Sequence, residues 1–479
     1  MRPFVCACFR CLLFLSVSFL TRADEVKILT NHIGYEATGP KHAVILSSAN
    51  QEFTGCTLNN AGDHHVVFSV VPQHVGPVKK WREWEFWTID FDSVTTEGSY
   101  YFVCTSGHHA IHSYPFAIQR LILERNTLSD AIYYFKDARS SGLMDQADHH
   151  LPFDGAPQKG TLDAHGGWWD ATGDYGKHLS HLSFSTYFNP QQIPLVIYSL
   201  FKSTELLNQR GAPEYLRYKN RMLDEAMFGA DYLARVKVPN GSFYRSISTG
   251  GVNQVPEERK VAGEMKKFGI YQSADKAPRD MVEKANNDLE YEVSYRSGGG
   301  VAVAALAIAS TFPFSGEFKT SDYRKAAEEA FAFLETNNLK LINDGKENIV
   351  DDYCALVAAT ELYKATKKDE YKSAADKRAN NLLNRLVSNG GYANYWRADD
   401  AMRPFFHASD AGFPVVSLLY YSELASPEIK ARIREVVRKS LEFQLTVDAE
   451  VANPFDYARQ LTQDKDGNRH TSFFFPHNT

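Results

Sequence analysis

The segment from His165 to His178 concentrates side chains that could perform acid–base chemistry. Asp170 and Asp174 are four residues apart, and the glycines around them permit tight backbone geometry and close approach of a ligand. Inverting hydrolysis of a glycosidic bond needs one carboxylate to activate water and a second, protonated carboxyl group to protonate the leaving oxygen. Two acids in one loop could both hold the water, and the proton donor would then come from elsewhere. The alternative is that both aspartates are turn and cap residues.

A metal site is a second interpretation of the same segment. Asp174, His178 and His181 would share one face if the segment were helical, because residues three and four apart are neighbours on a helix. One carboxylate and two imidazoles are a plausible set of ligands for zinc or iron. Histidines at helical spacing are more often surface or core residues, so this site remains the minor alternative.

Other loops also combine acidic, basic and aromatic residues. The residues are Asp288, Glu290, Glu292, Tyr295 and Arg296 in one loop, and Trp396, Asp399, Asp400, Arg403, His407 and Asp410 in another. Asp351 and Asp352 open a helical pattern, and we interpret them as caps because the helix dipole favours acids there. The sequence has no Gly-x-Ser-x-Gly segment, which disfavours a serine hydrolase.

The first 23 residues have the pattern of a signal peptide. Arg2 and Arg10 supply positive charge, the run 11–20 is apolar, and small residues follow it. This run is short for a membrane span, so we expect the mature chain outside the cytosol, secreted or periplasmic, and not in a membrane. A formal net charge of −6 disfavours nucleic acid as a partner.

Three cysteines lie beyond the predicted signal peptide. Cys56 and Cys104 both fall in the N-terminal module and could pair in an oxidising compartment. Cys354 lies in an apolar helical pattern, which is typical of a buried thiol.

The elements around these residues divide the chain in two. Residues 24–118 contain short β-rich runs separated by turn signals, which predict a β-sandwich. From residue 119 to 479 the pattern is helical, with long loops between the helices. Ser426 and Pro427 predict a helix start. The predicted apolar stripe of that helix is Ile429, Ile433, Val436, Val437, Leu441 and Leu445.

The segment Gly166–Lys177 resembles the signature of glycoside hydrolase family 9. The module that carries Asn31–Tyr35 resembles the immunoglobulin-like domain that precedes many catalytic domains of this family. Further matches are Phe228–Leu233, Tyr295–Gly298 and Asn453–Phe455. The resemblance covers nearly the whole mature chain, and the order of the motifs makes it specific.

The resemblance implies an (α/α)6 barrel after the sandwich and inverting hydrolysis of β-linked glucans. By position, Asp174 matches the general base and Asp170 the carboxylate that helps to hold the water. The implied sugar-binding residues are Trp168, Trp169, Tyr175, Tyr295, Arg296 and Trp396. We expect a monomer that needs no cofactor, with structural calcium as an option.

Two departures from the family pattern affect these expectations. Thr172 is an extra residue between the two aspartates. Cellulose is the default substrate of the family, but because of this departure xyloglucan, mixed-linkage glucan and glucosamine polymers stay open, as does endo or exo action. The family's general acid is a glutamate beyond the Asn-Pro motif, and no glutamate follows Glu450 in this sequence. We expect an incomplete barrel without the general acid, and the alternatives are a non-catalytic β-glycan-binding protein and the metal-dependent hydrolase described above.

Overall fold

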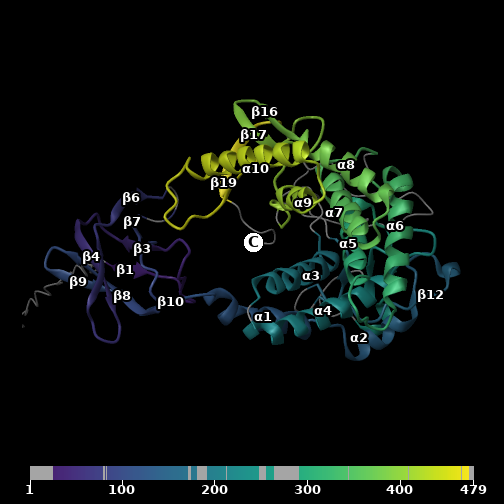
Figure 1. Cartoon of the computed structure of the whole chain (residues 1–479), viewed down its shortest axis with the longest axis horizontal. Helices are drawn as coiled ribbons and strands as arrows, with labels where there is room; N and C mark the ends of the chain where they lie inside the picture. Colours follow the sequence, from purple (N-terminus) through teal and green to yellow (C-terminus); the bar gives the residue numbers. More distant parts are fainter. Residues whose placement is uncertain are drawn as a thin grey trace, which may run out of the picture. The chain divides into compact units, whose positions relative to one another are not determined.

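The computed structural model describes residues 25–78, 81, 83–170, 174–180, 191–211, 213–247, 255–263, 291–342, 345–407, 409–464 and 466–473. The chain divides into two compact units, one up to Ile122 and one from Leu123 onward. Figure 1 shows the strands of the first unit in purple and blue and the helices of the second unit from teal to yellow.

The first unit consists of two β-sheets. One sheet has the order β1 (Val26–Leu29), β3 (His42–Ser47), β7 (Glu85–Asp90) and β6 (Gln73–Pro77). The other has the order β2 (Tyr35–Glu36), β10 (Phe116–Gln119), β8 (Gly98–Ser106), β4 (Phe53–Asn60) and β5 (Val66–Val70), and β9 (His109–His112) pairs with β8. Along β8, Tyr100, Phe102 and Cys104 alternate with less buried residues, as expected for a strand with one face in a core.

The disulfide between Cys56 and Cys104 joins two adjacent strands of this core. The two residues are direct cross-strand partners of β4 and β8, and their Cα atoms are 4.0 Å apart. Both side chains are buried. The pairing that the sequence left open is therefore present in the structure, whereas Cys354 is a free, buried thiol as predicted.

Replacing both Cys56 and Cys104 by serine should lower the unfolding free energy of the first unit by about 2–4 kcal/mol, because the disulfide restricts the unfolded chain. Denaturant unfolding of the oxidised wild type and the double variant measures this difference. Reduction of the wild type should reproduce the loss, and coincident unfolding curves for oxidised and reduced protein would contradict the prediction.

The second unit is built from helices in two layers. The described helices are α1 (Ile122–Asp137), α2 (Gly142–Ala147), α3 (Ile193–Arg210), α4 (Leu216–Arg235), α5 (Gly300–Ala309), α6 (Thr320–Leu341), α7 (Ile349–Thr366), α8 (Asp369–Leu383), α9 (Phe413–Ser422) and α10 (Pro427–Asp448). In the described chain, α3 contacts α5, α5 contacts α7, and α7 contacts α9. Each of these four helices also packs against the helix that follows it along the chain. None of the described helices is long and apolar enough to cross a bilayer.

The burial of the helices fits this arrangement. All residues of α5 are buried, because an inner helix contacts other helices on every side. The outer helices α4, α6, α8 and α10 alternate buried and exposed positions. Figure 1 shows the helix pairs following one another from teal α3 to yellow α10. Alternating inner and outer helices are the arrangement expected of an α/α barrel.

Short strand pairs lie in the loops between the helices. They are β11 (Leu151–Pro152) with β12 (Thr161–Leu162), β13 (Lys177–His178) with β14 (Ser246–Ile247) and β15 (Val261–Ala262), β16 (Leu386–Asn389) with β17 (Tyr392–Trp396), and β18 (Arg459–Gln463) with β19 (Arg469–Phe473).

Helix α10 begins as predicted, but its apolar stripe differs from the prediction. The Ser426 hydroxyl oxygen accepts a hydrogen bond from the Ile429 N–H at 3.4 Å, so Ser426 is the N-cap. Toward the C-terminus, Leu441 and Leu445 are exposed. The reason is that this half of α10 packs against β17 and β18, and the Gln444 side chain donates to the Arg459 carbonyl from the covered face.

Candidate active site

The loop that carries Asp170 and Asp174 is closed by a backbone hydrogen bond. The Asp170 N–H donates to the Gly176 carbonyl at 2.9 Å. The Gly176 N–H in turn donates to the Asp174 carboxylate at 2.9 Å. Both carboxylates therefore belong to one closed loop that leads into β13; residues 171–173 of this loop, Thr172 among them, lie outside the described residues.

His178 lies close to Asp174, but on a strand. A Cβ atom at Gly176 would lie 2.5 Å from His178 Nε2 and 3.0 Å from Asp174 Oδ1, so any other residue here would displace the His178 ring. His178 Nδ1 is 2.9 Å from the Ser246 hydroxyl of the neighbouring strand β14. Because His178 belongs to β13, the helical face predicted for Asp174, His178 and His181 is wrong at its first two positions, and His181 lies outside the described residues.

A cavity of about 190 Å³ lies beside Asp170. Its described lining includes Trp169 and His178 from the signature segment, Tyr134 and Phe135 from α1, and Gln192. The rings of Trp169 and Tyr175 meet edge to face with centroids 4.9 Å apart, and both residues are partly exposed. Aromatic faces next to a carboxylate suit a sugar ring. Tyr134 and Phe135 were not predicted from the sequence, because they lie on α1, far from the signature segment along the chain.

Trp168 also lines this cavity, but its side chain is buried and only 4% exposed. Its indole N–H donates to the Glu225 carboxylate at 2.8 Å, and its ring packs edge to face against Phe135 and Phe228. Trp168 thus takes part in the packing around the cavity, and its contact with sugar stays a prediction.

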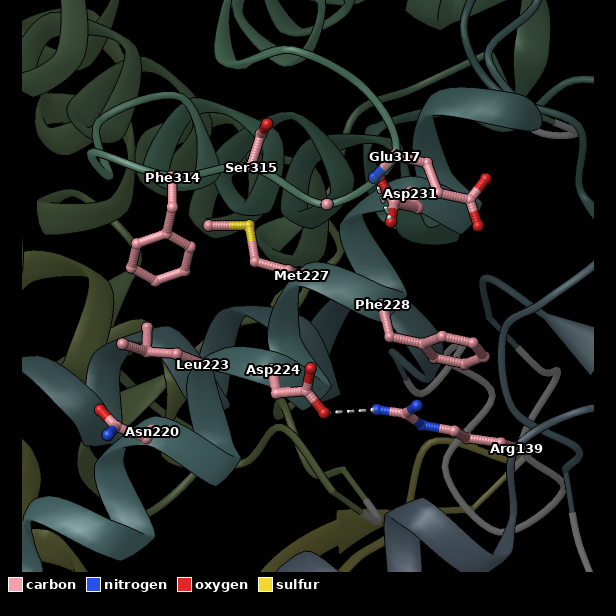
Figure 2. A pocket seen from close by; sticks show the side chains of 11 residues that line it. Arg139, Asn220, Leu223, Asp224, Met227, Phe228, Asp231, Phe314, Ser315 and Glu317 are labelled. Atoms are coloured by element: carbon pink, nitrogen blue, oxygen red, sulfur yellow. Dashed lines mark hydrogen bonds and ion pairs between the residues drawn. The ribbon is translucent and has the colours of Figure 1, made fainter.

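Glu225, the hydrogen-bond partner of Trp168, is itself paired with Arg139, and Arg139 lines a second cavity of about 460 Å³ (Figure 2). The Arg139 Nε donates to the Glu225 carboxylate at 2.9 Å, and its guanidinium also lies 3.3 Å from Asp224, as the dashed line in Figure 2 shows. The guanidinium stacks on the Phe228 ring at 4.1 Å. Glu225 therefore fixes the indole of Trp168 by a hydrogen bond, and Arg139 fixes Glu225. Neither residue was predicted from the sequence.

Tyr295, Arg296 and Trp396 are not among the described lining of the cavity beside Asp170. Tyr295 is fully buried, and its hydroxyl donates to the Glu335 carboxylate at 2.9 Å. Arg296 is buried beside it and donates from Nε to the Asp351 carboxylate at 2.8 Å. Trp396 lies on β17 and is half-buried. The buried Tyr295 and Arg296 thus take part in packing at the start of α5.

Asp351 and Asp352 are the predicted caps of α7, with a second role. The Asp351 carboxylate accepts the Asn348 N–H at 2.9 Å, which completes a capping box. Both side chains are also buried in ion pairs, Asp351 with Arg296 and Asp352 with Arg385 at 2.6 Å. The interpretation as caps is confirmed for Asp351, and the buried ion pairs are a feature that the local sequence did not indicate.

A fully buried group of three charged residues lies under the signature loop. The Asp148 carboxylate is 2.6 Å from Lys177 Nζ and accepts two hydrogen bonds from Arg259, at 2.6 and 2.8 Å. All three side chains are 0% exposed. Burial lowers the pKa of Lys177 to about 8, and the Asp148 carboxylate opposes this shift. The sequence did not reveal the group, since Asp148 and Arg259 are 111 residues apart.

These three residues hold both ends of the signature segment. Lys177 Nζ also donates to the carbonyls of Ala164 and Gly166 at 2.6 and 2.8 Å. Arg259 Nη1 donates to the carbonyl of Tyr175, the residue after Asp174, at 2.8 Å. The backbone on both sides of the two aspartates is thus fixed by charged groups that water cannot reach.

Comparison with known proteins identifies the family of the chain. The sequence profile of glycosyl hydrolase family 9 matches residues 125–439, and that of the cellulase N-terminal immunoglobulin-like domain matches residues 23–108. A xyloglucan-specific endo-β-1,4-glucanase of Bacteroides ovatus is 25% identical over 396 residues, 74% of this chain and 60% of the relative. A cellulose 1,4-β-cellobiosidase of Acetivibrio thermocellus is 27% identical over 194 residues, 34% of this chain and 21% of the relative. The chain thus spans less than two thirds of the length of these two curated relatives.

Two solved structures share the fold. A family 9 glycoside hydrolase of Bacteroides ovatus superposes with a TM-score of 0.56 at 18% identity, over 90% of this chain and 75% of that one. A metagenome-derived family 9 endoglucanase superposes with a TM-score of 0.52 at 19% identity, over 90% of this chain and 84% of that one. The predicted immunoglobulin-like sandwich and (α/α)6-barrel fold are confirmed. The chain belongs to glycosyl hydrolase family 9.

Proposed function

We propose that this protein hydrolyses β-1,4-linked glucans with inversion of anomeric configuration. Asp174 acts as the general base, and Asp170 helps to hold the attacking water. The proposal is carried by the closed loop, which joins Asp170 and Asp174 through Gly176 and places Asp170 beside the partly exposed ring of Trp169. A carboxylate accepts the proton of water, and an aromatic face binds the apolar face of a sugar. Membership of family 9 supports the same chemistry.

The substrate we propose is an unsubstituted or xylosylated β-1,4-glucan. One curated relative carries the name of a cellobiosidase and the other of a xyloglucan-specific endoglucanase. Trp169 and Tyr175 are the proposed sugar contacts of the described site, whereas the buried Trp168 positions the loop. We also propose that the protein acts outside the cytosol, because the disulfide between Cys56 and Cys104 is typical of an oxidising compartment.

The test is the product formed from cellopentaose and from a xyloglucan oligosaccharide. The anomeric signals in proton NMR should show the α-anomer first, before mutarotation, on whichever substrate is cleaved. Initial formation of the β-anomer would overturn the inverting mechanism. The length distribution of early products from a long glucan separates endo from exo action.

A further inference from the structure

Three potential metal ligands converge outside the proposed active site. His149, Asp163 and His165 each offer one ligand atom, and these atoms all lie within 4.8 Å of one another. Asp163 Oδ1 is 2.6 Å from His165 Nδ1 and 3.4 Å from His149 Nδ1. The two imidazole rings stack with centroids 4.1 Å apart and an interplanar angle of 21°. Both histidines therefore direct their Nδ1 edges at the same carboxylate oxygen.

The hairpin β11–β12 explains why these residues meet. Leu151 pairs with Leu162 in the two strands, so the residues just before β11 and just after β12 are neighbours across the base of the hairpin. The Ala164 N–H donates to the Asp148 carbonyl at 2.8 Å, which continues the pairing beyond the strands. His149 thus faces the segment with Asp163 and His165, although at least 14 residues separate them along the chain.

The donor set suits a borderline divalent cation. Two imidazole nitrogens and one carboxylate oxygen are typical ligands of Zn²⁺, whereas calcium and magnesium favour sites built from oxygen atoms. With Zn–N distances of about 2.0–2.1 Å, donor atoms around a tetrahedral ion lie roughly 3.3 Å apart. The 3.4 Å between His149 Nδ1 and Asp163 Oδ1 is near this value. The 2.6 Å between His165 Nδ1 and Asp163 Oδ1 is a hydrogen-bond distance, which would lengthen by about 0.7 Å when the metal binds.

The surroundings of His165 provide independent support. Its other ring nitrogen, Nε2, lies 3.8 Å from a carboxylate oxygen of Glu317. Glu317 is paired with Arg235, and Arg235 Nη1 also donates to the His165 carbonyl at 3.3 Å. Histidines that bind metals commonly direct the second ring N–H toward a carboxylate, which fixes the tautomer and the ring orientation. A simple hydrogen bond between His165 and Asp163 would not account for His149 at the same oxygen.

We propose that His149, Asp163 and His165 bind one zinc-type divalent cation, with water in the remaining position. The three side chains are 43%, 50% and 21% exposed, so a metal ion can enter from solvent and exchange. Bound metal ties together the two ends of the β11–β12 hairpin. One end carries Asp148 of the buried charged group, and the other leads directly into Gly166. The metal therefore stabilises the support of the signature loop and takes no part in bond cleavage.

The experiment titrates Zn²⁺ into the chelator-treated full chain by isothermal calorimetry. The wild type should bind one equivalent. His149→Gln and Asp163→Asn each remove a ligand from a partly exposed position and should weaken binding at least 100-fold. Glu317→Gln should weaken it by about 10- to 100-fold. His150→Gln is the matched control, because this exposed histidine adjoins His149 but does not belong to the cluster, and it should bind like the wild type.

Thermal unfolding gives a second readout that does not depend on activity. Zn²⁺ should raise the Tm of the wild type and of His150→Gln, but not that of Asp163→Asn. Asp174→Asn should still bind one equivalent, so failure of the proposed hydrolysis would leave this result intact. The proposal is overturned if the wild type binds no zinc, if Asp163→Asn binds it as tightly as the wild type, or if His150→Gln loses binding equally.

Discussion

Asp174→Asn should lower kcat on a β-1,4-glucan by about 10²- to 10⁴-fold, the usual contribution of a positioned general base. The amide oxygen of asparagine can still accept the Gly176 N–H, which now donates to the Asp174 carboxylate at 2.9 Å. The closed loop therefore keeps its shape, and the variant loses only the group that takes a proton from water. Initial rates of reducing-end release at saturating substrate measure the effect.

Two measurements separate this loss from a loss of structure. Substrate affinity, measured by calorimetry with cellopentaose, should stay within a few-fold of the wild type, and the near-ultraviolet circular dichroism should not change. Asp154→Asn is the matched control, because Asp154 is a half-exposed aspartate that pairs with Lys260 at 3.0 Å. If Asp174→Asn retains the wild-type kcat, Asp174 is not the base.

The signature loop could be predicted from the sequence because its chemistry is contiguous. Asp170 and Asp174 are neighbours along the chain, and Gly176 closes their loop through local hydrogen bonds. The cap Ser426 was predictable for the same reason, since its partner Ile429 is three residues away. The spacing of residues that are close along the chain therefore predicts loop closure and helix capping without the tertiary structure.

The residues that support the loop could not be predicted in this way. Arg259 reaches Asp148 across 111 residues, and His149 meets Asp163 only after a hairpin has formed. The direction of a side chain depends equally on tertiary structure. Trp168 and Trp169 are adjacent and chemically identical, yet the fold buries only Trp168 against Glu225. Long-range pairing and side-chain direction are set by packing, and one sequence does not encode them in a local pattern.

Asp148→Asn should lower the unfolding free energy by about 3–5 kcal/mol. The substitution leaves the side chains of Lys177 and Arg259 buried without their shared counter-charge, and breaking a buried ion pair from one side typically costs this much. Denaturant unfolding of the wild type and the variant at neutral pH measures the loss. The exposed pair of Asp154 with Lys260 again gives the control, since Asp154→Asn should cost no more than about 1 kcal/mol.

The pH dependence of this loss tests its electrostatic origin. Burial lowers the Lys177 pKa to about 8 in the wild type, and without the opposing Asp148 charge this pKa falls further. Between the Lys177 pKa of the folded variant and that of the folded wild type, the folded variant has released a proton that the folded wild type still binds. Lys177 of both unfolded chains remains protonated up to about pH 10.4. Stability rises with pH wherever the unfolded state binds more protons, so the variant regains stability relative to the wild type in this interval. The cost of Asp148→Asn should therefore be largest at low pH and decline as the pH approaches 8; a cost that is constant from pH 5 to 9 would show that lost packing, and not unpaired charge, destabilises the variant.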